Sequence, residues 1–111
     1  MKIIREACIE NATFLKDYIK AGADRIELCD NLYAGGTTPS LGTIGYSKNI
    51  CKERGVELAV MIRARGGDFV YSRFEKEIML EDKEIKRLVN RHIWTSIAVN
   101  AIAMILVVIG V

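Results

Sequence analysis

Segments with strand character alternate with segments of helical periodicity over the first 89 residues, and this alternation limits the fold more than any other feature. The predicted strands are Lys2–Cys8, Arg25–Cys29 and Glu57–Ile62, and the predicted helices are Ala12–Ala21, Leu41–Arg54 and Ser72–Val89. The order βαβαβα predicts an α/β fold with a parallel sheet and right-handed crossovers. An open doubly wound sheet and a barrel both satisfy this order.

Residues typical of helix ends support the boundaries of two of these helices. Asn11 and Ser40 precede the first and second helices, where their side chains can cap the free N–H groups. Gly22 and Gly55 follow the same helices, where a glycine commonly ends a helix. Each helix is therefore expected to stop before the next strand begins.

The second strand carries charged and thiol side chains on one face. Arg25, Glu27 and Cys29 are separated by single apolar residues, so they point to the same side of the sheet. Glu6 and Cys8 share one face of the first strand in the same way. Helices covering both faces of an open sheet would need apolar residues here, whereas a barrel can enclose a polar face.

Two arginines leave the end of the third strand, close to where ligands bind in parallel β/α proteins. One hypothesis is a pocket for a small anion, because arginine forms bidentate bonds to carboxylate or phosphate. The alternative is a structural layer of ion pairs inside a barrel, since buried charges are costly unless paired. The residues considered for this site are Glu6, Arg25, Glu27, Arg63 and Arg65.

Cys8 and Cys29 lie near equivalent ends of neighbouring strands. Adjacent strands are about 4.8 Å apart, so the two thiolates can share a soft metal ion such as Cu(I). The alternative is that each cysteine is a small buried apolar residue. Cys51 falls within a predicted helix and is assigned to packing, and the isolated His92 is not assigned as a ligand.

Several classes of protein receive no support. Three cysteines without a CxxC pair argue against a disulfide framework, and a reducing cytoplasm is the simplest setting for residues 1–91. The net charge of +2 is dispersed, which argues against a nucleic-acid partner. The glycine-rich stretches match neither GxGxxG nor a P-loop.

Three motifs carry a family resemblance. The stretches GADRIELC (Gly22–Cys29), GGTTPSLG (Gly35–Gly42) and RARGGDFVYS (Arg63–Ser72) resemble the copper homeostasis protein CutC family in order and spacing. The resemblance covers about residues 2–89, with departures at Thr37 and Ala64 in loops.

The resemblance implies a TIM-type (β/α) barrel, of which this chain would hold three βα units. It also implies a cytoplasmic role in copper homeostasis, with Cys8 and Cys29 as the metal candidates on matching positions. The family barrel is roughly twice the size of this chain. Three units would leave two open edges, so a homo-oligomer, a docking partner or rearrangement into an open sheet is expected.

The end of the chain differs from the rest. All 16 Lys and Arg and all 14 Asp and Glu lie between Lys2 and Arg91, whereas Ile93–Val111 carries no charge. A helix over these residues would be about 28 Å long, close to the thickness of a bilayer core. We therefore predict two parts, a barrel fragment at 1–91 and an apolar helical tail at 92–111 that can contact a membrane and leaves the fragment in the cytoplasm. An accidental tail from a disrupted gene is the alternative.

Three functional hypotheses follow. The first is a truncated CutC-like protein that takes part in copper homeostasis by binding Cu(I) through Cys8 and Cys29. The second is a fragment of a TIM-barrel enzyme with a pocket for a small anionic substrate. The third is a small membrane-associated protein without catalysis. No catalytic residue is assigned, and a non-enzymatic role is favoured for the truncated chain.

Overall fold

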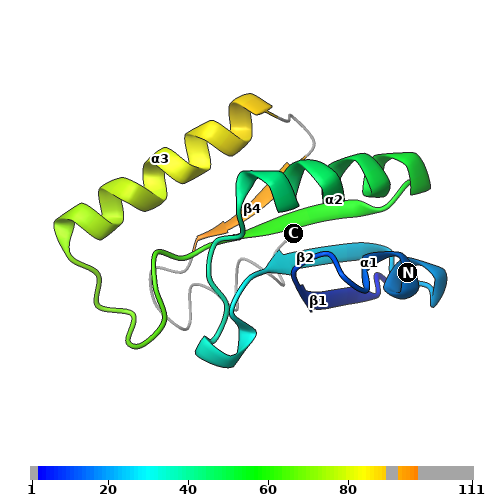
Figure 1. Cartoon of the computed structure of the whole chain (residues 1–111), viewed down its shortest axis with the longest axis horizontal. Helices are drawn as coiled ribbons and strands as arrows, with labels where there is room; N and C mark the ends of the chain where they lie inside the picture. Colours follow the sequence, from blue (N-terminus) through cyan, green and yellow to red (C-terminus); the bar gives the residue numbers. More distant parts are fainter. Residues whose placement is uncertain (1–2, 90–92, 98–111) are drawn as a thin grey trace.

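The computed structural model describes residues 3–89 and 93–97, which form one parallel sheet with helices between its strands (Figure 1). The elements in chain order are β1 (Glu6–Glu10), α1 (Leu15–Lys20), β2 (Arg25–Cys29), the short 3-10 helix η1 (Leu32–Ala34), α2 (Leu41–Arg54), β3 (Glu57–Ile62), α3 (Arg73–Val89) and β4 (Ile93–Ile97).

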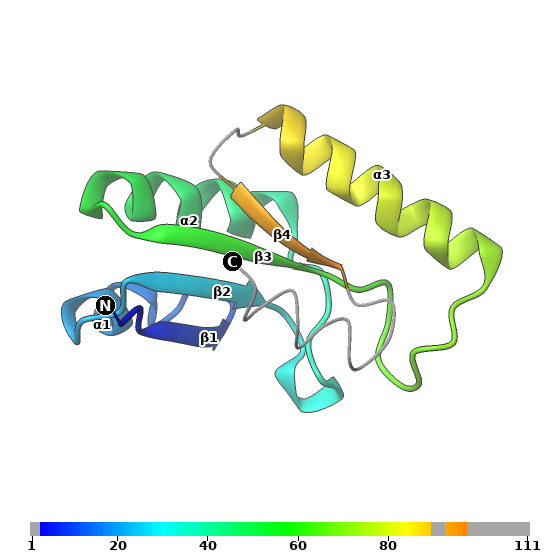
Figure 2. The same ribbon diagram turned by 180° about the vertical axis from the view of Figure 1, so that it is seen from behind.

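The strands lie in the spatial order β1-β2-β3-β4, and every neighbouring pair is parallel (Figures 1 and 2). The parallel direction predicted for the first three strands is confirmed. In the register of β1 and β2, Glu6 lies opposite Arg25 and Cys8 lies opposite Glu27. The register therefore brings the two charged and thiol-bearing faces predicted from the sequence together.

The described helices pack on one face of the sheet. Its apolar side chains form a core with α1 and α2 that contains Ile9, Leu15, Ile26, Leu28, Ile44, Ile50, Cys51, Leu58 and Val60. Ile62, on the same face of β3, packs against Tyr71 and Met79, and Met79 lies on α3. Helices confined to one side are what a barrel wall requires, whereas a doubly wound sheet places them on both sides.

The opposite face of the sheet carries the charged and thiol side chains. Arg25, Glu27 and Cys29 of β2 are buried, as are Ala59 and Met61 of β3. A buried face with this composition requires hydrogen bonds or ion pairs for its charged groups. This face contains the candidate site.

Most element boundaries agree with the sequence-based expectation. Ser40 Oγ accepts a hydrogen bond from Thr43 N (3.2 Å) at the start of α2, and Gly55 ends the helix with a φ of 68°. The first helix is shorter than predicted, because Asn11 has a φ of 50° and accepts from Thr13 N in a local turn. The helix begins only at Leu15.

The prediction of a helix from Ile93 onward is wrong for its first five residues. Ile93–Ile97 is β4, which pairs with β3 from Leu58↔Ile93 to Ile62↔Ile97. The physical reason is that β3 offers an open edge, and an uncharged run with β-branched residues suits a parallel strand as well as a helix. The rest of the predicted apolar helix, 98–111, lies outside the described residues. Within the described part of the chain, no helix combines the length and the apolar character needed to span a bilayer.

Candidate functional site

Two thiols and one carboxylate meet on the polar face of β1 and β2. Cys8 Sγ lies 3.8 Å from Cys29 Sγ, and Cys29 Sγ lies 3.9 Å from Glu27 Oε1. The potential ligand atoms of the three residues all lie within 4.8 Å of one another. The structure therefore brings together the two cysteines singled out from the sequence and adds Glu27 as a third donor.

The strand register explains this arrangement. Cys8 faces Glu27 directly across the β1–β2 pair, and Cys29 follows Glu27 two residues later on the same face. The two cysteines are thus diagonal neighbours, and diagonal Cα atoms on adjacent strands are about 7–8 Å apart. Disulfides seldom bridge Cα atoms separated by more than about 7 Å. The backbone favours two separate thiols, and all three cysteines are free.

A chain of ion pairs lies beside the three donors. Arg25 is only 6% exposed and pairs with Glu6 of β1, directly opposite it, and more distantly with Glu57 of β3 (Nη1 to Oε2, 3.5 Å). This arrangement satisfies the guanidinium in a setting where an unpaired charge would be costly. An ion pair therefore joins Glu6 and Arg25 next to the thiols.

The acid–base properties of the three donors differ because their surroundings differ. The hydrogen bond with Cys29 lowers the pKa of Cys8, whose side chain is the exposed one of the pair. The same hydrogen bond, together with burial, raises the pKa of Cys29. Burial, and then the nearby Glu6 carboxylate, raise the pKa of Glu27 to about 7. The first thiol to ionise is therefore Cys8.

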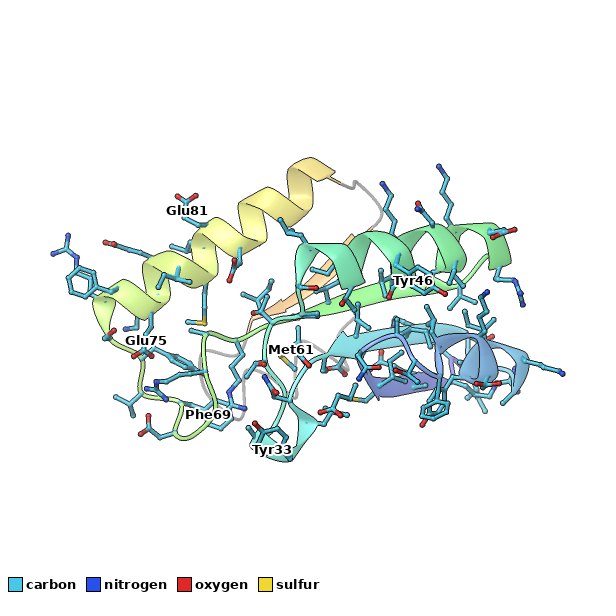
Figure 3. All side chains as sticks on the ribbon, in the orientation of Figure 1. Tyr33, Tyr46, Met61, Phe69, Glu75 and Glu81 are labelled. Carbon is cyan, nitrogen blue, oxygen red and sulfur yellow. The ribbon has the colours of Figure 1, made fainter. Side chains whose placement is uncertain are left out.

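Met61 completes the wall next to Cys29. Both side chains are buried and form a small apolar cluster with Phe69. Met61 and Phe69 are labelled in Figure 3. Sequence reasoning did not single out Met61, although its position in β3 places it on the same face as the thiols. Side chains alternate between the two faces of a strand, and this alternation along Glu57–Ile62 could have placed Met61 on the face of the thiols.

Arg63 lies beyond this cluster, in the loop that follows β3, and its guanidinium binds backbone. Nη1 donates to the carbonyls of Ala34 (2.7 Å) and Gly36 (3.1 Å), Nη2 donates to Gly67 O (2.7 Å), and Nε donates to the Tyr71 hydroxyl (3.2 Å). Its Cζ also lies 4.5 Å from the centre of the Phe69 ring. These contacts hold two loops together.

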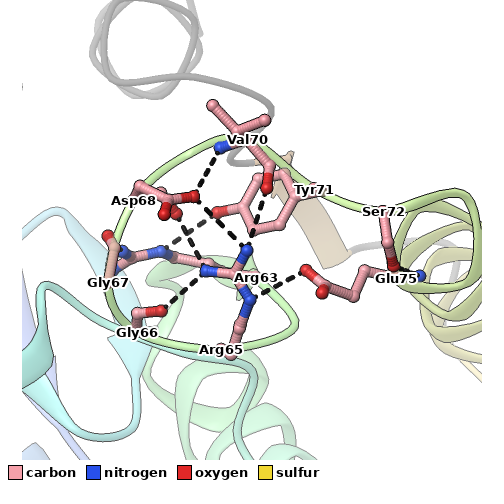
Figure 4. A network of polar contacts seen from close by, with 9 residues as sticks. All are labelled: Arg63, Arg65, Gly66, Gly67, Asp68, Val70, Tyr71, Ser72 and Glu75. Carbon is pink, nitrogen blue, oxygen red and sulfur yellow. Dashed lines mark hydrogen bonds and ion pairs between the residues drawn. The ribbon is translucent and has the colours of Figure 1, made fainter.

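Arg65 makes a second set of contacts within the same loop (Figure 4). Its guanidinium forms an ion pair with Glu75 of α3 (2.9 Å) and donates to Val70 O (2.9 Å) and Asp68 O (3.1 Å). Asp68 in turn accepts from Val70 N, which lowers the pKa of its carboxyl group together with the hydrogen bond from Arg65. Arg65 thereby links the loop to the first turn of α3.

The five residues considered for an anion pocket thus fall into two groups. Glu6, Arg25 and Glu27 lie together on the polar face of the sheet, whereas Arg63 and Arg65 lie in the loop after β3. A cavity of about 650 Å³ borders the second group at the carboxyl ends of β2 and β3. Its lining includes Asp30, Thr38, Ser40, Arg63, Arg65 and Asp82.

A parallel sheet covered by helices on one face, with paired thiols and ion pairs on the other, defines an α/β protein with a candidate soft-metal site. The model of the CutC family matches residues 3–103, and the chain belongs to that family. The match extends past the limit of about residue 89 expected from the motifs and includes β4.

Individual relatives agree with this assignment. A CutC family protein of Enterococcus faecalis is 48% identical over 87 residues, which is 78% of this chain and 42% of that protein. The human copper homeostasis protein cutC homolog is 41% identical over 85 residues, which is 77% of this chain and 30% of that protein. The crystal structure of CutC from Streptococcus agalactiae matches with a TM-score of 0.69 and 53% identity, covering 73% of this chain and 39% of that one.

The chain spans about 30 to 42% of the length of these relatives. What the complete relatives do therefore enters only as a proposal for this chain.

Proposed function

We propose that this chain binds Cu(I) through Cys8 and Cys29 and thereby takes part in copper homeostasis. The observation that carries the proposal is the 3.8 Å separation of the two Sγ atoms. Metal–sulfur bonds are about 2.3 Å long for a comparable ion, so one ion can contact both atoms without a change in the backbone. Soft thiolate ligands suit Cu(I), as they suit other thiophilic ions such as Zn²⁺.

Burial and exposure of the pair also support the proposal. Cys29 is fully buried, while Cys8 is exposed and gives an incoming ion access to the site. Cys8 also has a lowered pKa, and the thiolate is the form that binds metal. The three free cysteines fit a reducing compartment such as the cytoplasm. The names of the human and mouse relatives agree with a copper-related role.

The test is Cu(I) titration of the reduced full chain against a chromophoric competitor. About one Cu(I) per chain is expected, and Cys8→Ala or Cys29→Ala should each weaken binding by tenfold or more because each removes one of two thiolates. Cys51→Ala is the matched control, since Cys51 lies in the core between the sheet and the helices. Undiminished Cu(I) binding by the Cys8→Ala/Cys29→Ala double variant would rule the proposal out.

The proposal also carries a pH dependence. Both thiols must lose their protons to bind, and Cys29 has a raised pKa. Protons therefore compete with the metal, and affinity should fall as the pH is lowered. Competitor titrations at several pH values measure this directly, and an affinity that does not change with pH would argue against thiolate ligation.

A further inference from the structure

The cysteine pair has a neighbour that a two-thiolate Cu(I) site does not require. Glu27 Oε1 lies 3.9 Å from Cys29 Sγ, and Glu27 faces Cys8 across the strand pair. The carboxylate is 5% exposed and belongs to the group of three donors within 4.8 Å of one another. Its position relative to the two sulfur atoms follows from its place two residues before Cys29 on β2 and from the register between β1 and β2.

The Glu27 carboxylate changes the kind of ion that the site suits. A carboxylate oxygen is a harder ligand than a thiolate. Zn²⁺ accepts carboxylate oxygen as well as thiolate sulfur, whereas Cu(I) favours sulfur. Two thiolates and one carboxylate carry a formal charge of −3. A monovalent ion would leave −2 in a buried site and a divalent ion would leave −1.

Within the described part of the chain, the cation next to this charge is shared with other carboxylates. Arg25 lies next to Glu27, and it also pairs with Glu6 and Glu57. Because uncompensated charge is costly in a buried site, the donor set is better balanced by a divalent ion. The exposed side chain of Cys8 leaves the site open on one side, where a water molecule can fill a fourth position as in other zinc sites with three protein ligands.

We propose that Cys8, Glu27 and Cys29 form a three-donor site that binds Zn²⁺ as well as Cu(I), and that Glu27 determines the balance between the two ions. The inference rests on the proposed metal function of the cysteine pair. Under this inference Glu27 is a metal ligand and not only a member of the ion-pair layer.

The test compares Zn²⁺ and Cu(I) affinities of the reduced full chain, each measured with a chromophoric competitor. Glu27→Gln keeps the size of the side chain and removes the anionic ligand. It should weaken Zn²⁺ binding at least about tenfold and change Cu(I) binding less than about threefold. Glu57→Gln is the matched control, because Glu57 also pairs with Arg25 but lies outside the three-donor group.

The outcomes separate this inference from the proposed function. Unchanged Zn²⁺ affinity in Glu27→Gln, or an equal loss for both ions, overturns the role of Glu27 and leaves Cu(I) binding by the cysteines standing. If the cysteine variants bind both Zn²⁺ and Cu(I) as tightly as the unmutated chain, the proposed function itself is ruled out. X-ray absorption at the zinc edge of the unmutated chain gives a readout that does not depend on a variant's folding. Two sulfur neighbours with light-atom donors are expected, and fewer than two sulfurs would overturn the site.

Discussion

Thr38 and Arg63 are joined by three hydrogen bonds. Thr38 N and Thr38 Oγ1 both donate to Arg63 O (3.1 Å each), and Arg63 N donates to Thr38 Oγ1 (2.8 Å). The two residues lie 25 positions apart in the chain and join the loop after β2 to the end of β3. The Arg63 side chain then extends the connection to the loop carbonyls described above.

Replacing Arg63 with alanine should destabilise the fold. The change removes four side-chain hydrogen bonds and leaves the Gly36 carbonyl without this buried donor. We expect the free energy of unfolding to fall by about 3 kcal/mol, measured by chemical denaturation. Arg63→Lys should recover only part of the loss, because lysine lacks the planar group that reaches several carbonyls at once. Arg73→Ala is the control, since Arg73 is exposed and pairs with Glu77 on its own helix. Equal effects at Arg63 and Arg73 would contradict a structural role for Arg63.

Two glycines should respond in opposite directions to alanine. Gly35 has a φ of 90°, and a Cβ built there would lie 2.6 Å from Arg63 Nη1. Gly35→Ala should therefore lower the free energy of unfolding by about 1–3 kcal/mol. Gly45 lies inside α2, and a Cβ added there would meet open space. Gly45→Ala should therefore raise the free energy of unfolding by about 0.5–1 kcal/mol. Paired thermal melts compare the two variants, and the same sign for both would show that the local geometry is not decisive.

The stability of the metal-free chain should depend on pH through Glu27. The pKa of its carboxyl group is about 7 in the folded chain, compared with about 4.3 for an unperturbed glutamate. Between these values the folded state holds a proton that the unfolded state has lost, so the free energy of unfolding falls as the pH rises from about 4.5 to about 7. At about 1.4 kcal/mol for each pKa unit, the contribution is on the order of 3 kcal/mol.

Glu27→Gln cannot ionise and should remove this part of the pH profile. Denaturation curves of the two proteins at closely spaced pH values should converge at low pH and separate toward pH 8, with the variant the more stable. Profiles that run parallel throughout would mean that Glu27 has an ordinary pKa in the folded chain.

The three cysteines should differ in reactivity toward an alkylating reagent. Cys8 is exposed and has a lowered pKa, so it should react first. Cys29 and Cys51 are buried, and burial raises the pKa of Cys51 to about 11, so both should react only as the chain unfolds. Mass spectrometry of the reduced native chain after brief iodoacetamide treatment identifies the order. Early labelling of Cys51 would contradict the packing of α2 on the sheet.

The sequence was most informative where local and overall patterns agree. The limits of β2, β3 and α2 follow from alternation, from a continuous apolar run and from capping residues, and the structure confirms them. The end of the chain was misread at β4 because an uncharged, apolar segment fits both a membrane helix and a buried parallel strand. Only the open edge of β3, a feature of the assembled sheet, distinguishes them.

The candidate site was predictable in part for a similar reason. The shared face of Cys8, Arg25, Glu27 and Cys29 follows from strand periodicity, but the proximity of Glu27 to both thiols depends on the register between two strands. The contacts of Arg63 could not be predicted, because most of its partners are backbone carbonyls. Any residue type supplies a carbonyl, so the sequence gives no sign of them.

The strict alternation of apolar and polar side chains along β2 makes a one-residue error in its register against β1 costly. Ile26 and Leu28 lie in the core while Arg25, Glu27 and Cys29 face the other way, so a shift of one residue against β1 would exchange both sets at once. Such a shift would drive two charges into the apolar layer and eject two large aliphatic side chains. A chain in which β2 has slipped by one residue has therefore lost its donor geometry and its core together, so the hydrophobic effect disfavours that misalignment of the metal site.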